Sequence, residues 1–235
     1  YLIQPQHLGV SSWYSFDSTG WDFSSPKMKG YDSQDDISKK FPKVYDTANR
    51  LFEWWNNVNS GSVSIDTYSE YIRLSSWIDY IIHAEITFNR DGLVNNLMLA
   101  SWSATETSGL WDVMPYDLDE TLGVIYYQAS SNCQPDKIGL CVKSDTGAGT
   151  PFELIYNAFL PQIKTRWKFL RDSNVVSAET IVSQIEKIMN CMDASSVQQD
   201  WSLWGVSDQA TFPYLCDWTT RRIAWLDEQW GYSAS

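Results

Sequence analysis

The chain has 235 residues, of which 43% are hydrophobic, so it is long enough for one large domain or two small ones with an ordinary core. Its formal net charge is −12, with 29 acidic and 17 basic side chains. This excess argues against nucleic acid and anionic membrane surfaces as ligands, because both are bound largely through Lys and Arg. No apolar stretch approaches the ~18 residues that span a bilayer, so we expect no membrane insertion.

The cysteines, histidines and aromatic residues limit which metal sites, disulfides and ligands are expected. The four cysteines are Cys133, Cys141, Cys191 and Cys216. None has C-x-x-C spacing, so a structural zinc site is not expected, although Cys133 and Cys141 could close their loop as a disulfide or remain free buried thiols. His83 falls among apolar residues of a predicted helix, where a packed or half-exposed histidine is expected. Thirteen Trp and thirteen Tyr point either to ring-stacking ligands or to a Trp-rich core.

Residues 1–30 predict short strands and turns, punctuated by Gly20 and Pro26. Helical periodicity begins near Ile37 and ends before Gly61. A second long helix is predicted from Ser64, a suitable N-cap, to Phe88. This helix leads directly to Asn89 and Asp91.

A β-hairpin is predicted next, from the apolar runs 97–103 and 110–117. The hairpin should fold Asp117 back towards Asn96, so that residues separated in sequence become neighbours. Pro115 in the second run favours an edge strand or an irregular one, because proline cannot donate to a sheet.

The remainder of the chain is predicted to be a loop followed by helices. Residues 124–150 show little periodicity, whereas 151–172 predict two helices split by Pro161. A further helix is expected over 177–193, with Ile181, Ile185 and Ile188 on one face, and a last one from about Asp208 to Trp230. No internal repeat or interdomain linker is found, so we predict a single domain over residues 1–235.

Asp91, Asn96 and Asp117 are the candidate chemical groups. Taken separately, NRDG at 89–92 could be a helix stop, and DLDETLG at 117–123 could be a strand end with a capped turn. Taken together, they follow the order that phosphoryl transfer requires: a base for the acceptor hydroxyl, then an amide and a carboxylate for metal on the nucleotide phosphates. Hard oxygen ligands of this kind suit Mg²⁺.

At these residues the chain resembles the spore-coat protein H (CotH) kinase family of atypical kinases. The first part of the resemblance is N-x-D-x3-N-N, matched by Asn89, Asp91, Asn95 and Asn96. The second is W-x-x-x-P-x-D-L-D, matched by Trp111, Pro115, Asp117, Leu118 and Asp119. The strand-like segments at 1–6 and 20–27 and the closing helices also look like this family, so the resemblance covers most of the chain.

The resemblance implies an α+β, mostly helical, atypical protein-kinase-like C-lobe that transfers phosphate from ATP to Ser or Thr of proteins with Mg²⁺ or Mn²⁺. Asp91 would be the catalytic acid of the loop, and Asn96 and Asp117 would bind metal. Asp119 would be a second ligand or would orient Asp117, and Asn95 would pin the loop. Trp111 would support the nucleotide pocket together with Asp117. In this scheme residues 1–30 are a β-rich remnant beside a missing or separate nucleotide lobe, 31–123 carry the catalytic helices and hairpin, and 151–235 form the helical tail.

Two departures from the family pattern accompany this resemblance. The lysine of the family's nucleotide lobe and its Glu partner normally lie upstream, and none of Lys27, Lys29, Lys39, Lys40 or Lys43 sits in a strand that looks like the setting of that lysine. Gly92 also stands where the family often has an aromatic residue. The first residue is also not Met. From this and the lack of a suitable lysine, we expect that an upstream N-terminal segment is needed for nucleotide binding.

Two alternatives remain open. One is a catalytically silent, kinase-derived structural component of a spore coat or phage virion, whose partner would be an assembly protein. Such a role, like kinase activity on coat proteins, favours association with a surface or particle. The other is a glycoside hydrolase or sugar-binding domain, since paired carboxylates among many aromatic residues also suit sugar chemistry.

Overall fold

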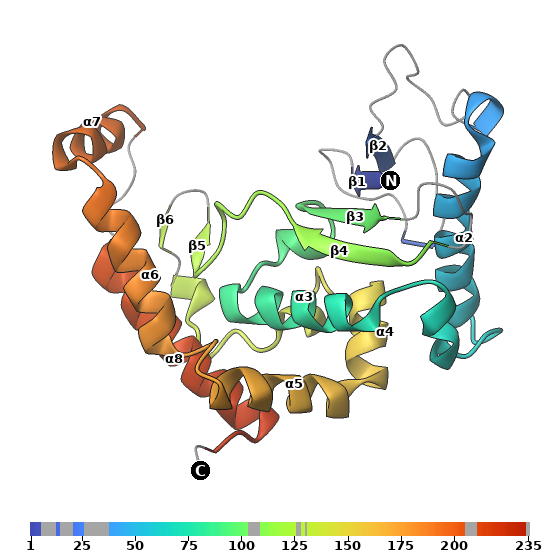
Figure 1. Cartoon of the computed structure of the whole chain (residues 1–235). Helices are drawn as coiled ribbons and strands as arrows, with labels where there is room; N and C mark the ends of the chain where they lie inside the picture. Colours follow the sequence, from blue (N-terminus) through green and yellow to red (C-terminus); the bar gives the residue numbers. More distant parts are fainter. Residues whose placement is uncertain are drawn as a thin grey trace.

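The computed structural model describes residues 1–5, 13–14, 21–25, 38–102, 109–125, 128–129, 131–204 and 211–233. Within them the fold is α+β and mostly helical, as predicted, with a small antiparallel sheet beside the helices (Figure 1). The helices are α2 (Pro42–Asn59), α3 (Leu74–Thr87), α4 (Pro151–Ala158), α5 (Leu160–Asp172), α6 (Ala178–Cys191), α7 (Ala194–Trp204) and α8 (Phe212–Trp230). The strands are β1 (Leu2–Pro5), β2 (Trp21–Ser25), β3 (Leu97–Ser101), β4 (Trp111–Pro115), β5 (Val124–Ile125) and β6 (Gln128–Ala129). Short 3₁₀ turns are η1 (Ile65–Glu70), η2 (Asp91–Leu93), η3 (Ser131–Cys133) and η4 (Cys141–Lys143).

The predicted hairpin is present as β3 and β4. The main sheet has the order β2-β1-β3-β4, and its neighbouring strands are antiparallel. Leu97 pairs with Pro115 and Ser101 with Trp111, while most of the predicted turn lies outside the described residues. Pro115 is therefore in an edge strand, as its missing N–H requires.

The second predicted helix is two elements. Ser64 does act as an N-cap, and its hydroxyl accepts a hydrogen bond from the Asp66 amide, but it caps the 3₁₀ turn η1. The chain then leaves the helical path so that Ile72 can form a bridge with Trp111, with the Arg73 amide donating to the Trp111 carbonyl. Helix α3 starts only after this contact. Pairing with the open edge of β4 thus overrides the helical periodicity.

The C-terminal half follows the prediction in outline. Pro161 lies in the first turn of α5, and the helical path breaks at Phe159 between α4 and α5. Helix α6 begins after Ser177, whose hydroxyl accepts from the Thr180 amide. The last helix starts at Phe212 rather than near residue 208, and α7 was not predicted as a separate helix. Residues 124–150, expected to be loop, contain the short pair β5–β6 and two 3₁₀ turns.

The aromatic surplus is largely core. Nine of the twelve Trp side chains whose burial the structure describes are buried, and several pack edge to face, such as Trp21 on Phe52 and Trp167 on Trp230. Aromatic pairs of this kind add to the stability gained from buried area. The Trp content is thus accounted for by packing, which removes the main support for a sugar-binding domain.

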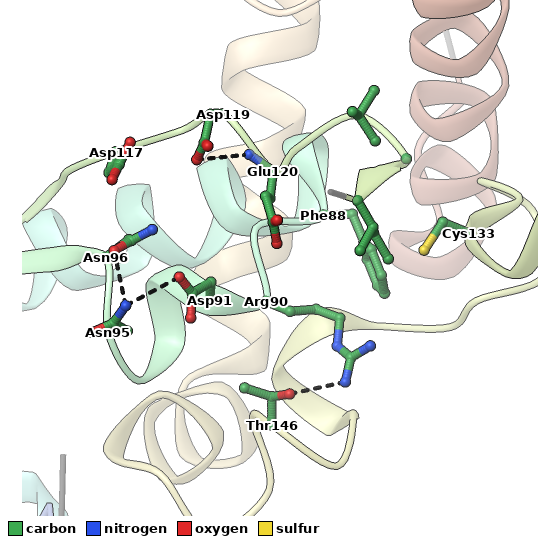
Figure 2. Close-up of a pocket in the computed structure, with 13 residues that line it drawn as sticks. Phe88, Arg90, Asp91, Asn95, Asn96, Asp117, Asp119, Glu120, Cys133 and Thr146 are labelled. Atoms are coloured by element: carbon green, nitrogen blue, oxygen red, sulfur yellow. Dashed lines mark hydrogen bonds between the residues drawn. The ribbon is translucent and has the colours of Figure 1, made fainter. Parts of the chain in front are cut away.

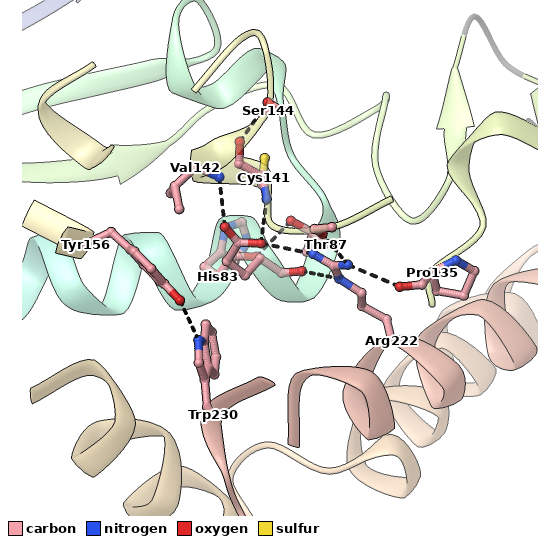
Figure 3. Close-up of polar contacts among 11 residues, drawn as sticks. His83, Thr87, Pro135, Cys141, Val142, Ser144, Tyr156, Arg222 and Trp230 are labelled. Carbon is pink, nitrogen blue, oxygen red and sulfur yellow. Dashed lines mark hydrogen bonds and ion pairs between the residues drawn. The ribbon is translucent and has the colours of Figure 1, made fainter. Parts of the chain in front are cut away.

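A buried ion pair ties three segments together below the sheet (Figure 3). The carboxylate of Glu85 on α3 accepts from the guanidinium of Arg222 on α8 at 2.9 Å and from the amides of Cys141 and Val142 in η4. Both charged side chains are fully buried. Burial raises the pKa of the Glu85 carboxyl, an effect that Arg222 and the two amides oppose. This network fixes η4, and with it the following loop, relative to α3.

Cys133 and Cys141 are both buried thiols, so the disulfide alternative is not realised. His83 is packed within α3, and burial lowers its pKa. Within the described part of the chain, no helix combines the length and apolar character needed to cross a bilayer.

Candidate active site

Asp91 lies in a tight loop that starts where α3 ends. Phe88 adopts a left-handed backbone conformation (φ 53°), which stops the helix and turns the chain. The backbone amides of Asn95 and Asn96 both donate to the Asp91 carbonyl, at 2.7 and 3.1 Å, so the loop closes on itself. The Asn95 side chain donates to the Asp91 carboxylate at 3.3 Å and to the Asn96 side-chain oxygen at 3.1 Å. Asn95 therefore holds the loop, the role expected of it.

Asp117 is brought to this loop by the hairpin. After the last β3–β4 pair, Leu97 with Pro115, the Tyr116 amide donates to the Asn96 carbonyl at 3.3 Å. Asp117 follows in a left-handed conformation (φ 51°), which turns the chain away from β4. Asp tolerates this conformation better than most residues. Figure 2 shows Asp117 and Asp119 above Asn96 and Asp91.

These groups border one cavity of about 580 Å³. Its lining residues are Phe88, Arg90, Asp91, Asn95, Asn96, Asp117, Asp119, Glu120, Gly123, Val124, Ile125, Cys133 and Thr146. Four of them are carboxylates and one, Arg90, is basic, so the cavity is strongly acidic. A smaller cavity of about 220 Å³ adjoins it and shares Asn95, Asn96 and Asp117, with Gln4, Pro5 and Tyr116 on its other wall.

A family model described as CotH kinase protein matches residues 9–226 of this sequence. The chain belongs to the CotH kinase family. The match spans the loop, the hairpin and the helical tail that border or support the cavity. Searches of curated proteins and of solved structures found no significant match.

Of the residues expected to form the CotH kinase site, four come together and one does not. Asp91, Asn96, Asp117 and Asp119 line the same cavity. Trp111 is instead 1% exposed in the core, and its indole N–H donates to the Thr47 carbonyl. It is not among the residues of either cavity, so any effect on a nucleotide would be indirect. This hydrogen bond directs its indole at α2 rather than at the cavity, which accounts for its burial in the core.

The oxygen donors at the cavity suit a hard divalent cation. Among the described residues, no group hydrogen-bonds to the Asp117 carboxylate, so both oxygens remain open to a ligand. Asn96 adds an amide oxygen, and Asp119 keeps one carboxylate oxygen besides the one that accepts from the Glu120 amide. No cluster of three His, Cys, Asp or Glu side chains able to hold a metal was found in the described part. Carboxylate and amide oxygens of this kind are hard ligands of the type that Mg²⁺ prefers.

Gly92, a departure from the family pattern, is required by the packing beneath the loop. Its amide donates to the side-chain oxygen of Asn89 at 2.8 Å, and its carbonyl accepts from the Tyr80 hydroxyl at 2.5 Å. A Cβ at this position would lie 2.3 Å from the Asn89 side-chain nitrogen and 2.7 Å from the Tyr80 oxygen. Burial raises the pKa of Tyr80, so this hydroxyl stays protonated and remains a donor.

Gly92→Ala is therefore expected to destabilise the protein by about 1–3 kcal/mol, as overpacking of a close contact does. It should also displace Asp91, the next residue upstream, and lower any activity that depends on it. Urea denaturation measures the stability. In an Asn89→Ala background the nearest clashing atoms are absent, so Gly92→Ala should cost less there; equal costs in both backgrounds would contradict the packing explanation.

Among the cavity residues that sequence reasoning missed, three are charged or carry a hydroxyl: Arg90, Glu120 and Thr146. Arg90 directly precedes Asp91, and Glu120 follows Asp119, so adjacency to the motifs was the available signal. Thr146 comes from the aperiodic segment 124–150, where no local pattern indicates which side chains meet the cavity. The lysines Lys39, Lys40 and Lys43 are helical, as their exclusion from strands predicts, whereas Lys27 and Lys29 lie outside the described residues.

Proposed function

We propose that this chain is the catalytic lobe of an atypical protein kinase that transfers the γ-phosphoryl group of ATP to Ser or Thr of proteins with Mg²⁺ or Mn²⁺. The observation that carries the proposal is that Asp91, Asn96, Asp117 and Asp119 line one cavity in a member of the CotH kinase family. The mostly helical fold, with a hairpin delivering Asp117 to the loop, supports it. Spore-coat or virion proteins are the proposed acceptors or partners, which would place the protein on a particle or surface.

The two cavities suggest how the roles divide. Asn96 and Asp117 border both cavities, whereas Asp91 borders only the larger one. Asp91 would accept the proton of an acceptor hydroxyl in the larger cavity. Asn96 and Asp117, with Asp119 as a further ligand or orienting group, would hold the divalent cation. That cation would neutralise charge on the nucleotide phosphates.

Electrostatics make metal dependence a strict requirement of this proposal. Four carboxylates and a single arginine line the larger cavity, so a bare nucleotide would meet repulsion. Bound divalent cations reverse that balance. Chelation by EDTA should therefore remove ATP binding as well as transfer.

Transfer of labelled phosphate from ATP to a general acceptor protein, in the presence of Mn²⁺ or Mg²⁺, tests the proposal. Asp91→Asn should lower the rate by about 10²–10⁴-fold, the usual contribution of a general base. Asp172→Asn is the matched control, because Asp172 is an exposed carboxylate paired with Lys168 away from the cavity. Unchanged transfer in Asp91→Asn would refute the assigned base.

One observation favours the alternative of a catalytically silent structural component. No lysine is among the residues that line either cavity in the described part. We propose that an upstream segment supplies the nucleotide-binding lysine, so the product of the complete open reading frame is the protein to assay. If ATP with Mn²⁺ does not raise the melting temperature of that protein, the structural alternative is preferred.

A further inference from the structure

The larger cavity contains a hydroxyl of the chain itself. Among the described residues that line it, Thr146 alone carries a Ser, Thr or Tyr hydroxyl. Its side chain is partly exposed and borders the same cavity as Asp91 and Asp117, with its hydroxyl directed at the Arg90 guanidinium (Figure 2). A Ser/Thr kinase site therefore already has one candidate acceptor at hand.

Arg90, the one basic side chain among the described lining residues, holds this hydroxyl. The Arg90 guanidinium donates to the Thr146 hydroxyl at 3.0 Å and to the Asp145 carboxylate at 2.5 Å. The pair with Asp145 is exposed, since the Asp145 side chain is 84% accessible, and such surface pairs contribute little. The Nε–H of Arg90 is buried and has no hydrogen-bond partner among the described residues. Arg90 thus has donor capacity that the present contacts do not use.

The loop that carries Thr146 is fixed at its base and open at its tip. The amides of Cys141 and Val142 donate to the buried Glu85 carboxylate, which anchors the start of the loop. Ser144 closes it through its hydroxyl, which accepts from the Gly147 amide at 3.2 Å. The tip at Asp145 and Thr146 faces solvent and cavity, so a change at Thr146 would act on a short, tethered segment.

We infer that Thr146 is phosphorylated by this chain's own active site and that the Arg90 guanidinium then holds the phosphate in place of Asp145. The inference rests on the proposed function. In the reaction, the Thr146 oxygen bonds to the γ-phosphorus of ATP, the bond from that phosphorus to the β,γ-bridging oxygen breaks, and ADP leaves with the electron pair. The hydroxyl proton passes to the Asp91 carboxylate.

Charge explains why the product would stay on Arg90. Phosphothreonine carries close to two negative charges at neutral pH and three acceptor oxygens, against one charge on Asp145. Arginine binds phosphate in a two-point, charge-assisted geometry. Phosphorylation would therefore stabilise the loop against the catalytic loop through the residue next to Asp91, and would remove the hydroxyl from the acceptor position.

The first test incubates the product of the complete open reading frame with ATP and Mn²⁺ and maps phosphate by mass spectrometry, with an acceptor protein present. Phosphate is expected on Thr146 in the wild type and in Thr165→Val, whose hydroxyl lies on α5 outside the cavity, and not in Asp91→Asn. The fraction modified should not depend on protein concentration, because the hydroxyl is in the same molecule. Transfer to the acceptor without phosphate on Thr146 would overturn the inference alone. Absence of transfer to both would overturn the proposed function with it.

The second test does not depend on catalysis. Phosphothreonine is incorporated at position 146 during synthesis, and the melting temperature is compared with that of the unmodified protein. A rise is expected, and the Arg90→Gln substitution should remove it. A melting temperature that phosphate leaves unchanged, or raises equally in Arg90→Gln, would overturn the role of Arg90.

Discussion

Asp117→Ala is expected to abolish metal-dependent phosphoryl transfer, with a loss on the order of 10³-fold or more, because a metal ligand contributes several kcal/mol of charge stabilisation. The carboxylate is the least engaged of the cavity's acids and borders both cavities. Transfer of labelled phosphate across a Mn²⁺ titration measures the effect. Loss of rate with no recovery at high Mn²⁺ is the expected result.

Two further variants separate the loss of the ligand from backbone strain. Asp117→Asn retains a residue type that tolerates the left-handed conformation (φ 51°), so its loss of activity reports on the charge. Asp119→Ala should be milder, since one Asp119 oxygen already accepts from the Glu120 amide at 3.1 Å. Retained transfer in both Asp117 variants would refute the assignment of Asp117 as the metal ligand.

Arg222→Met is expected to destabilise the fold by about 3–5 kcal/mol, the usual cost of removing one partner from a buried ion pair. Besides Glu85, the guanidinium donates to the Pro135 and Gly139 carbonyls, so its loss leaves several buried acceptors unpaired. Urea denaturation measures the free energy of unfolding. Arg222→Met should weaken metal and nucleotide binding by a comparable free energy only if the substitution also displaces the η4 loop.

The pH dependence of that variant has a definite sign. Without Arg222, burial raises the pKa of the Glu85 carboxyl with less opposition, and a carboxyl with a raised pKa in the folded state destabilises the protein as pH rises. The loss in the free energy of unfolding caused by Arg222→Met should therefore become smaller as pH falls towards 4.5, the ordinary pKa of a glutamate carboxyl in the unfolded chain. Arg166→Met is the control: its pair with Asp79 is partly exposed, and less than about 1 kcal/mol should be lost. Equal losses in the two variants would contradict the burial argument.

Much of the site could be predicted from the sequence because it is made by local structure. The loop from Asn89 to Asn96 closes through its own backbone, and a hairpin places Asp117 beside Asn96 by strand register alone. Hydrophobic periodicity and turn-forming residues predict loops and hairpins of this kind directly from the sequence. The edge position of Pro115 and the helix break near Pro161 have the same origin, since proline acts on its own backbone.

Other features were decided only by tertiary contacts. Helix α3 begins late because Ile72 pairs with β4, and Trp111 belongs to the core because its indole is directed at α2. Glu85 and Arg222 are 137 residues apart, and Thr146 is 56 residues from the arginine that holds it. Periodicity carries no information on which distant side chains meet, because that depends on how whole elements pack. The residue types thus determined the order of the candidate site residues, whereas the packing of α8 and the η4 loop on α3 decided what surrounds them.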